Sequence, residues 1–267
     1  MNRLIIRIFA GTLTMLALLA PGVAGAQDFD HGHKAWDALL KRHVVLLQAG
    51  KASQVRYAGF AKDRAALKAY MDALSKVPET QFNGWSKAER MAFLINAYNA
   101  FTVEKILTRY PNLKSIRDFG TVFGNPWKDK FFTLFGRESY LDQIEHETLR
   151  KPGAYNEPRV HYAVNCASIG CPMLREEAYV AEKLEAQLEE QAARFLSDRS
   201  RNRFAAGKLE VSKIFDWFKE DFGVREQYFA KYAKLMADGP EAQKQVAEAK
   251  APLSFLDYDW SLNDATK

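Results

Sequence analysis

Apolar residues recur at helical spacing along most of the chain, which predicts a mainly helical protein. The predicted helices cover residues 36–48, 62–74, 86–110, 141–150, 175–197, 212–222 and 225–236. The clearest helix start is Ser86, because Glu89 follows three residues later and the two form a capping box. We expect this helix to end at Tyr110, since Pro111 disfavours helical geometry in the residue before it.

The predicted strands are fewer and shorter than the helices. They lie at residues 130–135, 138–140, 160–165 and 209–211. The first two are divided by Gly136 and predict a hairpin, and Ser139 is the expected cap of the helix that follows. No repeat, linker or low-complexity stretch divides the chain. The sequence therefore predicts one helix-rich α+β domain with a small antiparallel sheet.

The first 26 residues have the pattern of a signal peptide. Arg3 and Arg7 form a positive segment, the apolar run covers residues 5–19, and residues 24–26 read AGA, an A-x-A cleavage site. The run is shorter than the ~20 residues that a comfortable membrane span needs. We expect cleavage after residue 26 and a periplasmic or secreted protein, with residues 27–267 as a single globular domain.

The net charge of the chain bears on whether the protein binds nucleic acid. Removing 26 of the 267 residues leaves 241, and because the removed segment holds two arginines and no acids, the formal net charge falls from +5 to +3. This excess is spread along the chain, whereas nucleic-acid binding requires a basic face or stripe. No later stretch is apolar enough to cross a bilayer. We expect a small-molecule or peptide ligand, no nucleic acid and no stable membrane span after cleavage.

Both cysteines of the chain, Cys166 and Cys171, lie in the segment RVHYAVNCASIGCP (residues 159–172), together with one of the five histidines, His161. A histidine brought close to a cysteine can form a thiolate–imidazolium pair, in which the base raises the nucleophilic fraction of the thiol. This segment is therefore the first candidate for a chemical site.

The predicted local geometry of the segment favours such a meeting. On a strand, side chains alternate between faces, so His161 and Asn165 share one side. The chain then enters a tight turn in which Gly170 is able to take a positive φ and Pro172 fixes the exit.

Two other interpretations of these residues stay open. In an oxidising compartment Cys166 and Cys171 are expected to form a disulfide, although so short a loop stabilises the fold by about 2 kcal/mol at most. Such a bridge is compatible with chemistry if it is redox-active or masks the nucleophile. Zinc held by His161 and the two cysteines is a further alternative, but the C-x4-C spacing is unusual and no fourth ligand is evident. We expect no metal and no cofactor.

Two more polar groups lie on predicted helices. Glu145 and His146 are adjacent, so they point about 100° apart and do not pair directly. Together with Arg150 they either face a cleft or form a salt-bridged surface. Asn96 and Asn99 lie on one side of an otherwise apolar helix. Because buried amides must be hydrogen-bonded, they either pin neighbouring backbone or orient a catalytic histidine.

These segments resemble a known family. The similarity to domain-of-unknown-function family 547 is carried by FLINAYNAFTVEKIL (93–107), YLDQIEHETLR (140–150), RVHYAVNCASIGCPML (159–174) and YDWSLN (258–263). It covers roughly residues 85–203 plus the closing segment, and with the leader it suggests an exported bacterial member. The resemblance implies that the three polar groups belong to one site. By analogy it implies a papain-like or transglutaminase-like α+β arrangement, with a helix packed on a small sheet around a thiol and a histidine.

Our leading hypothesis is a thiol-dependent enzyme that acts on an acyl, amide or disulfide bond. Cys166 is the expected nucleophile and Cys171 a resolving partner. His161 or His146 is the expected base, oriented by Glu145 and Asn96. The alternative is a non-catalytic periplasmic binding protein with a structural Cys166–Cys171 disulfide and a polar ligand pocket. The expected ligand-binding side chains are Asn96, Asn99, Arg150 and Asn165.

Overall fold

The computed structural model describes residues 28–120 and 124–265, so the predicted signal peptide lies outside the described residues. The chain is helix-rich with small sheets, which confirms the α+β class. In the described ranges no helix combines the length and the apolar character that a membrane crossing requires.

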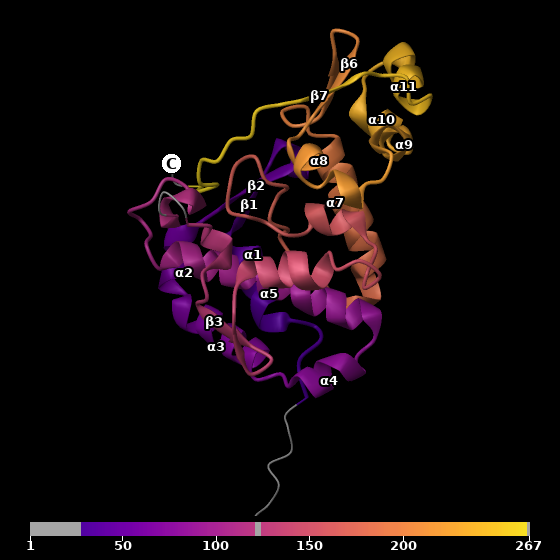
Figure 1. Cartoon of the computed structure of the whole chain (residues 1–267). Helices are drawn as coiled ribbons and strands as arrows, with labels where there is room; N and C mark the ends of the chain where they lie inside the picture. Colours follow the sequence, from indigo (N-terminus) through magenta and orange to yellow (C-terminus); the bar gives the residue numbers. More distant parts are fainter. Residues whose placement is uncertain (1–27, 121–123, 266–267) are drawn as a thin grey trace, which may run out of the picture.

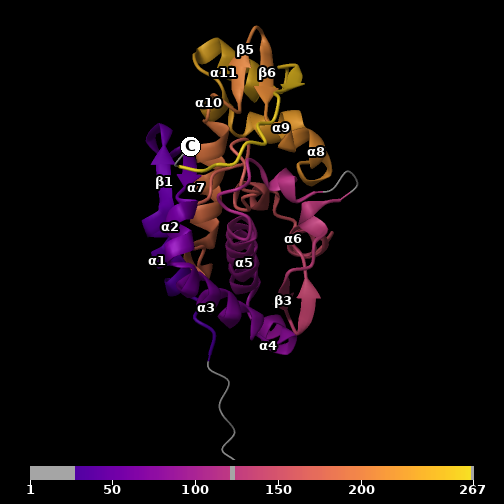
Figure 2. The ribbon, with the colours of Figure 1, turned by 90° about the vertical axis from the view of Figure 1, so that its left-hand side faces the viewer.

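The central element is helix α5 (Lys87–Leu107), which runs through the middle of the molecule (Figures 1 and 2). The predicted capping box is confirmed, because the Glu89 N–H donates to Ser86 Oγ at 3.2 Å and the Ser86 N–H donates to Glu89 Oε2 at 2.8 Å. The helix ends three residues before the expected Tyr110. Every residue from Met91 to Leu107 is buried, since other elements cover it on all sides.

One side of α5 is covered by α2 (Tyr57–Lys62) and α3 (Arg64–Ser75), and α1 (Lys34–His43) packs on these two helices. The short helix α4 (Glu79–Gly84) follows α3. The helix predicted to reach Gln48 ends at His43. Val44 instead begins strand β1 (Val44–Leu47), which pairs antiparallel with β2 (Ala52–Val55). The β-branched valines favour a strand, and the turn between the two strands takes positive φ values at residues 48–50.

The other side of α5 carries the predicted hairpin, β3 (Phe132–Leu134) with β4 (Arg137–Ser139), followed by α6 (Leu141–Ile144) and one π-helical turn (Glu145–Leu149). The expected cap by Ser139 is wrong. Tyr140 occupies the cap position without a side-chain bond, and the Ser139 hydroxyl donates to the Arg137 carbonyl.

The C-terminal elements are, in chain order, α7 (Leu184–Leu196), β5 (Arg203–Ala205), β6 (Lys208–Val211), α8 (Ile214–Trp217), α9 (Arg225–Ala230), α10 (Ala233–Met236), α11 (Pro240–Ala247) and β7 (Leu253–Phe255). The elements that follow α7 gather at one end of the molecule, at the top of Figure 1, whereas α7 itself runs along the middle. The acidic helix expected from residue 175 begins only at Leu184. The other two predicted helices are each divided, the first into α8 and a 3-10 turn (Lys219–Asp221) and the second into α9 and α10. The sheet is partly parallel, since β6 pairs parallel with β7.

Two apolar clusters form the core, a larger one around α5 and a smaller one around α8 to α10. The segment at residues 158–165 lies where they meet, because Tyr162 packs in the smaller cluster and Ala163 in the larger. The strand predicted there is wrong, since Pro158–Tyr162 forms a 3-10 helix. Proline suits the first helical position, and Asn99 from α5 binds the backbone that a neighbouring strand would otherwise have paired.

Candidate functional site

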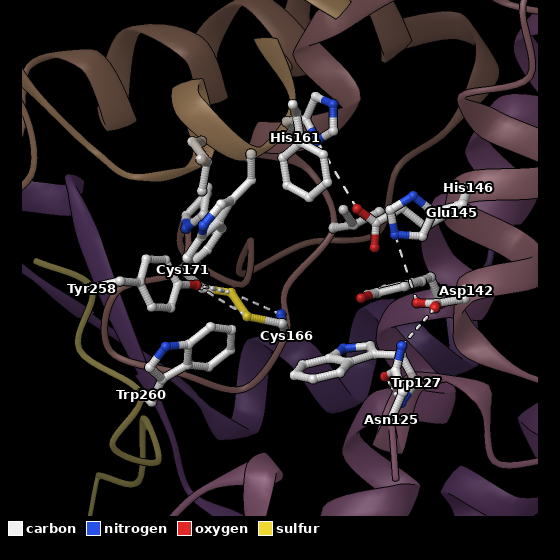
Figure 3. Close-up of a pocket in the computed structure, with 16 residues that line it drawn as sticks. Asn125, Trp127, Asp142, Glu145, His146, His161, Cys166, Cys171, Tyr258 and Trp260 are labelled. Carbon is white, nitrogen blue, oxygen red and sulfur yellow. Dashed lines mark hydrogen bonds and ion pairs between the residues drawn. A yellow bond between two sulfur atoms is a disulfide. The ribbon is translucent and has the colours of Figure 1, made fainter. Parts of the chain in front are cut away.

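A cavity of about 200 Å³ lies between α6, the 158–172 segment, α8 and the closing segment (Figure 3). Its lining has three parts, a pair of sulfurs, a polar end and an aromatic wall. The sulfurs are those of Cys166 and Cys171. The main polar and aromatic side chains are Asn125, Asp142, Glu145, His146, His161, Tyr98, Trp127, Trp217, Phe218, Tyr258 and Trp260.

The two cysteines form a disulfide, with their Cα atoms 6.2 Å apart. Cys166 is partly exposed, whereas Cys171 is 4% exposed. The positive φ of the turn falls on Ala167, at 62°, and not on Gly170 as the sequence suggested.

The sulfurs receive hydrogen bonds that sequence analysis did not predict. The Tyr258 hydroxyl lies 3.2 Å from Cys166 Sγ and donates to Cys171 Sγ at 3.1 Å. The Cys166 backbone N–H also donates to Cys171 Sγ, at 2.9 Å. Burial raises the pKa of Tyr258, which keeps its hydroxyl protonated and able to donate. The buried sulfur therefore has two donors directed at it.

The closing segment (residues 258–263) packs against the backbone at Gly170, next to the Cys166–Cys171 bridge. The Gly170 N–H donates to the Asp259 carbonyl at 2.8 Å, and the neighbouring Ile169 N–H donates to the Ser261 carbonyl at 2.8 Å. A Cβ added at residue 170 would lie 3.0 Å from the Asp259 backbone and 3.0 Å from Tyr258 Cδ1. Glycine is needed here for close approach, and this contact places Tyr258 beside the sulfurs.

We expect Gly170→Ala to destabilise the protein by about 1–3 kcal/mol, because the closing segment must move away from the added methyl group. Urea unfolding monitored by tryptophan fluorescence measures this change. Gly84→Ala is the matched control, since a Cβ there meets nothing within 4 Å and the φ is not positive. Equal stabilities of the two variants would contradict the close packing of the closing segment.

His161 is buried at the polar end of the cavity. Its Nε2 lies 2.6 Å from Asp221 Oδ2, and its ring stacks on Phe218 with centroids 4.3 Å apart. Its Nδ1 lies 4.0 Å from Glu145 Oε1. Arg150 Nε also donates to Asp221 Oδ2. Asp221, which sequence analysis missed, therefore fixes the orientation of the imidazole from a position 60 residues away.

The charge of Asp221 depends on these partners. Burial opposes ionisation, but the hydrogen bonds from His161 and Arg150 outweigh it and lower the pKa of Asp221 from 3.8 to about 2. Since the folded-state pKa lies below the unfolded value, the ionised carboxylate stabilises the fold above about pH 4. That contribution is lost as the pH falls towards 2.

We expect Asp221→Asn to lower the free energy of unfolding by about 1–2 kcal/mol at pH 7, allowing for screening of a partly exposed group. The difference from the wild type should shrink as the pH falls from 4 towards 2. Urea titrations at a series of pH values measure it. A difference that stays constant across that range would show that Asp221 is not held ionised by His161 and Arg150.

His146 lies between Arg150 and Asp142. An Arg150 N–H donates to His146 Nδ1, because arginine cannot accept a hydrogen bond. The other ring nitrogen, Nε2, lies 3.7 Å from Asp142 Oδ1. Burial raises the pKa of Asp142, and the neighbouring His146 and Asn125 partly offset this.

Arg150 does not line this cavity, although it was expected to bind the ligand. Its guanidinium lies behind both histidines, where it binds Asp221 and His146 and contacts the Phe218 ring, 4.6 Å from its centroid. It is therefore a positioning residue in this geometry.

The three asparagines expected to bind ligand hold backbone instead, and none lines the cavity. Asn96 exchanges two hydrogen bonds with Tyr179, at 2.7 and 3.0 Å. Asn99 donates to the Ala163 carbonyl at 2.9 Å and accepts from the Asn165 N–H at 2.8 Å. Asn165 in turn donates to the Pro172 carbonyl and accepts from the Ala167 N–H. The amides thus shape the loop that carries the bridge.

The structure brings five of the predicted residues to one cavity, namely Cys166, Cys171, His161, His146 and Glu145. It does not join an imidazole to a sulfur by a hydrogen bond anywhere in residues 28–120 and 124–265. The histidines lie at the opposite end of the cavity from the bridge, as Figure 3 shows.

A metal site is not formed by the side chains that the structure describes, since no group of three or more His, Cys, Asp or Glu residues there could hold an ion. The bridge also uses the two sulfurs that zinc would need as thiolates.

Three comparisons with known proteins bear on identity. Curated proteins and solved structures gave no match to this chain, so the papain-like arrangement stays an analogy. A family model described as "Protein of unknown function, DUF547" matches residues 82–196. That stretch carries α5, the π-helical turn with Glu145 and His146, and the bridge. Residues 82–196 of this chain are therefore similar to the DUF547 family.

Proposed function

We propose that this protein is a thiol–disulfide exchange enzyme of the periplasm or another secretory compartment, with the Cys166–Cys171 bridge as its reacting bond. The observation that carries the proposal is the asymmetry of the bridge. Cys166 is the more exposed residue, and Cys171 is buried with two hydrogen-bond donors directed at its sulfur. An incoming thiolate would reach the first sulfur and expel the second.

The proposed reaction balances as two successive displacements. A substrate thiol loses its proton and attacks Cys166 Sγ, the S–S bond breaks, and its electron pair passes to Cys171 Sγ. The resulting thiolate is stabilised by the Tyr258 hydroxyl and the Cys166 N–H and then takes up a proton. A second thiol attacks the substrate sulfur of the mixed disulfide and releases Cys166 as a thiol. Two thiols are oxidised to a disulfide, the bridge is reduced, and an external disulfide reoxidises it.

The histidines supply the proton transfer in this proposal. The Asp221 carboxylate accepts a hydrogen bond from the Nε2–H of His161. Nδ1 is then the ring nitrogen that can take up a proton. His146 presents Nε2–H and has no free acceptor nitrogen, because Nδ1 is bound by Arg150. His161 is therefore the better base of the two, and because it lies away from the bridge, it would take the proton of the incoming thiol through water in the cavity.

A non-catalytic binding protein is the second candidate, favoured by the aromatic wall of the cavity. In that case the bridge is structural and resists mild reductants. Exchange and binding predict opposite outcomes for the reactivity of the bridge.

The test of exchange is Tyr258→Phe, which removes one donor and leaves the ring in place. A hydrogen bond to a charged group is worth about 1.5–3 kcal/mol, so we expect dithiothreitol to reduce the bridge about 10–100-fold more slowly. Stopped-flow tryptophan fluorescence measures the rate. Tyr232→Phe is the control, because its hydroxyl binds Glu189 at 3.3 Å, away from the bridge. An unchanged rate in Tyr258→Phe would remove the support for a stabilised leaving thiolate.

A further inference from the structure

We infer that the cavity selects a small thiol that carries a positive charge, such as an aminothiol. This inference rests on the proposed function and adds the class of substrate to it. It depends on the charge, the walls and the size of the cavity.

The cavity lining is acidic although the whole chain has a net charge of +5. Asp142 and Glu145 line it, and the side chain of Glu145 is only 9% exposed. The lining residues include no lysine or arginine. An anionic ligand would lie against carboxylates without a lining cation to pair with, whereas an ammonium group would find a counter-charge.

The aromatic wall has the composition of a cation-binding surface. The centroid of the Trp260 ring lies 5.8 Å from the ring centroid of Trp127, 5.5 Å from that of Trp217 and 4.5 Å from that of Tyr258. The four rings therefore form one continuous aromatic group. Indole rings attract organic cations more strongly than other aromatic side chains do. Figure 3 shows Trp127 between the bridge and Asp142. A ligand whose sulfur meets Cys166 and whose cation meets the carboxylates would therefore pass beside this ring.

The size of the cavity limits the ligand. Its volume is about 200 Å³. Ligand pockets for drug-sized molecules are larger, at about 300–1,000 Å³. A thiol and an amine separated by a few carbons fit this volume, while a folded protein substrate could insert at most one side chain.

Reduction of the purified oxidised protein by three small thiols tests the inference. The thiols are cysteamine, 2-mercaptoethanol and mercaptoacetate, which carry a positive, neutral and negative group. Each rate is divided by the rate of the same thiol with bis(2-hydroxyethyl) disulfide, which removes differences in intrinsic reactivity. We expect cysteamine to exceed 2-mercaptoethanol at least tenfold, with mercaptoacetate the slowest. A smaller preference for cysteamine would overturn the inference.

Two variants locate the preference. Glu145→Gln should reduce the ratio of the cysteamine rate to the 2-mercaptoethanol rate at least threefold. Glu147→Gln is the matched control, because Glu147 is exposed on the same turn and binds the Tyr140 hydroxyl. We expect its ratio to equal that of the wild type. Equal ratios in both variants would contradict the role of the cavity carboxylates.

A binding measurement separates this inference from the proposed function. Choline has a cation and no thiol, and 3,3-dimethylbutan-1-ol has the same shape without the charge. We expect choline to change the tryptophan fluorescence of the oxidised protein at a concentration at least tenfold lower than the alcohol. Choline selectivity without thiol exchange would defeat the proposed enzyme and leave the cation site standing. Thiol exchange that shows no preference for cysteamine, together with no preference for choline in binding, would defeat the cation site and leave the proposed enzyme standing.

Discussion

Replacing Cys166 by serine is expected to abolish thiol–disulfide exchange, while replacing Cys171 should trap its first step. In Cys171→Ser the partly exposed Cys166 remains and should form a stable mixed disulfide with a small disulfide reagent. In Cys166→Ser the remaining thiol is the buried Cys171, which we expect to react at least about 100-fold more slowly. Intact mass spectrometry of each variant after timed exposure to the reagent measures both reactions.

The two cysteine variants are matched controls for each other. Both variants lose the same bridge. It joins cysteines five residues apart in the sequence and raises the free energy of unfolding by about 2 kcal/mol, because it restricts the unfolded chain. A difference in their reactivity therefore reports the positions of the two sulfurs and not a difference in folding. If Cys171 reacted as fast as Cys166, the bridge would have no preferred point of attack, and the order of displacement proposed above would be wrong.

Asn99→Ala is expected to lower the free energy of unfolding by about 2–5 kcal/mol. The side chain is 2% exposed and binds two backbone groups, the Ala163 carbonyl and the Asn165 N–H. Both groups would be left unsatisfied in the interior, and each such loss costs about 1–3 kcal/mol. Urea unfolding at pH 7 measures the change. Exchange should also slow, because the backbone leading into Cys166 is no longer fixed.

Asn112→Ala provides the control for this prediction, because Asn112 is exposed. We expect it to change stability by less than about 0.5 kcal/mol. A similarly small change in Asn99→Ala would contradict the view that this amide determines the course of residues 163–165.

The local signals in the sequence predicted the elements that depend on local interactions. The capping box at Ser86 fixes the start of α5, and the glycine turn at residue 136 fixes the hairpin. Both are short-range features, so tertiary packing did not alter them. The grouping of Cys166, His161 and Glu145 at one cavity followed from the family resemblance and not from spacing in the sequence.

The course of residues 158–165 was not predictable from local pattern, because alternation of apolar and polar residues is shared by strands and by short irregular segments. The deciding interaction is the Asn99 amide, which comes from a helix 64 residues earlier. The apolar spacing also predicted that the first helix continues beyond His43. The helix ends there because the β-branched residues and the tight turn that follow favour strand β1.

The partners of the reactive groups were also missed, because they are distant in sequence. Asp221 reaches His161 across 60 residues, and Tyr258 reaches Cys171 across 87. The closing segment YDWSLN was recognised as part of the family pattern, but nothing in its spacing indicated that its tyrosine binds the sulfurs. Gly170 is the one local feature of the sequence that could have suggested that another segment of the chain approaches closely there.

The reduction potential of the Cys166–Cys171 bridge tests the central claim most directly. Equilibration of the purified protein in glutathione and dithiothreitol buffers, followed by alkylation and mass spectrometry, measures it. We predict a value between about −120 and −270 mV, the range of catalytic dithiols, because two donors stabilise the Cys171 thiolate of the reduced form. A value below about −300 mV, typical of structural disulfides, would contradict the account.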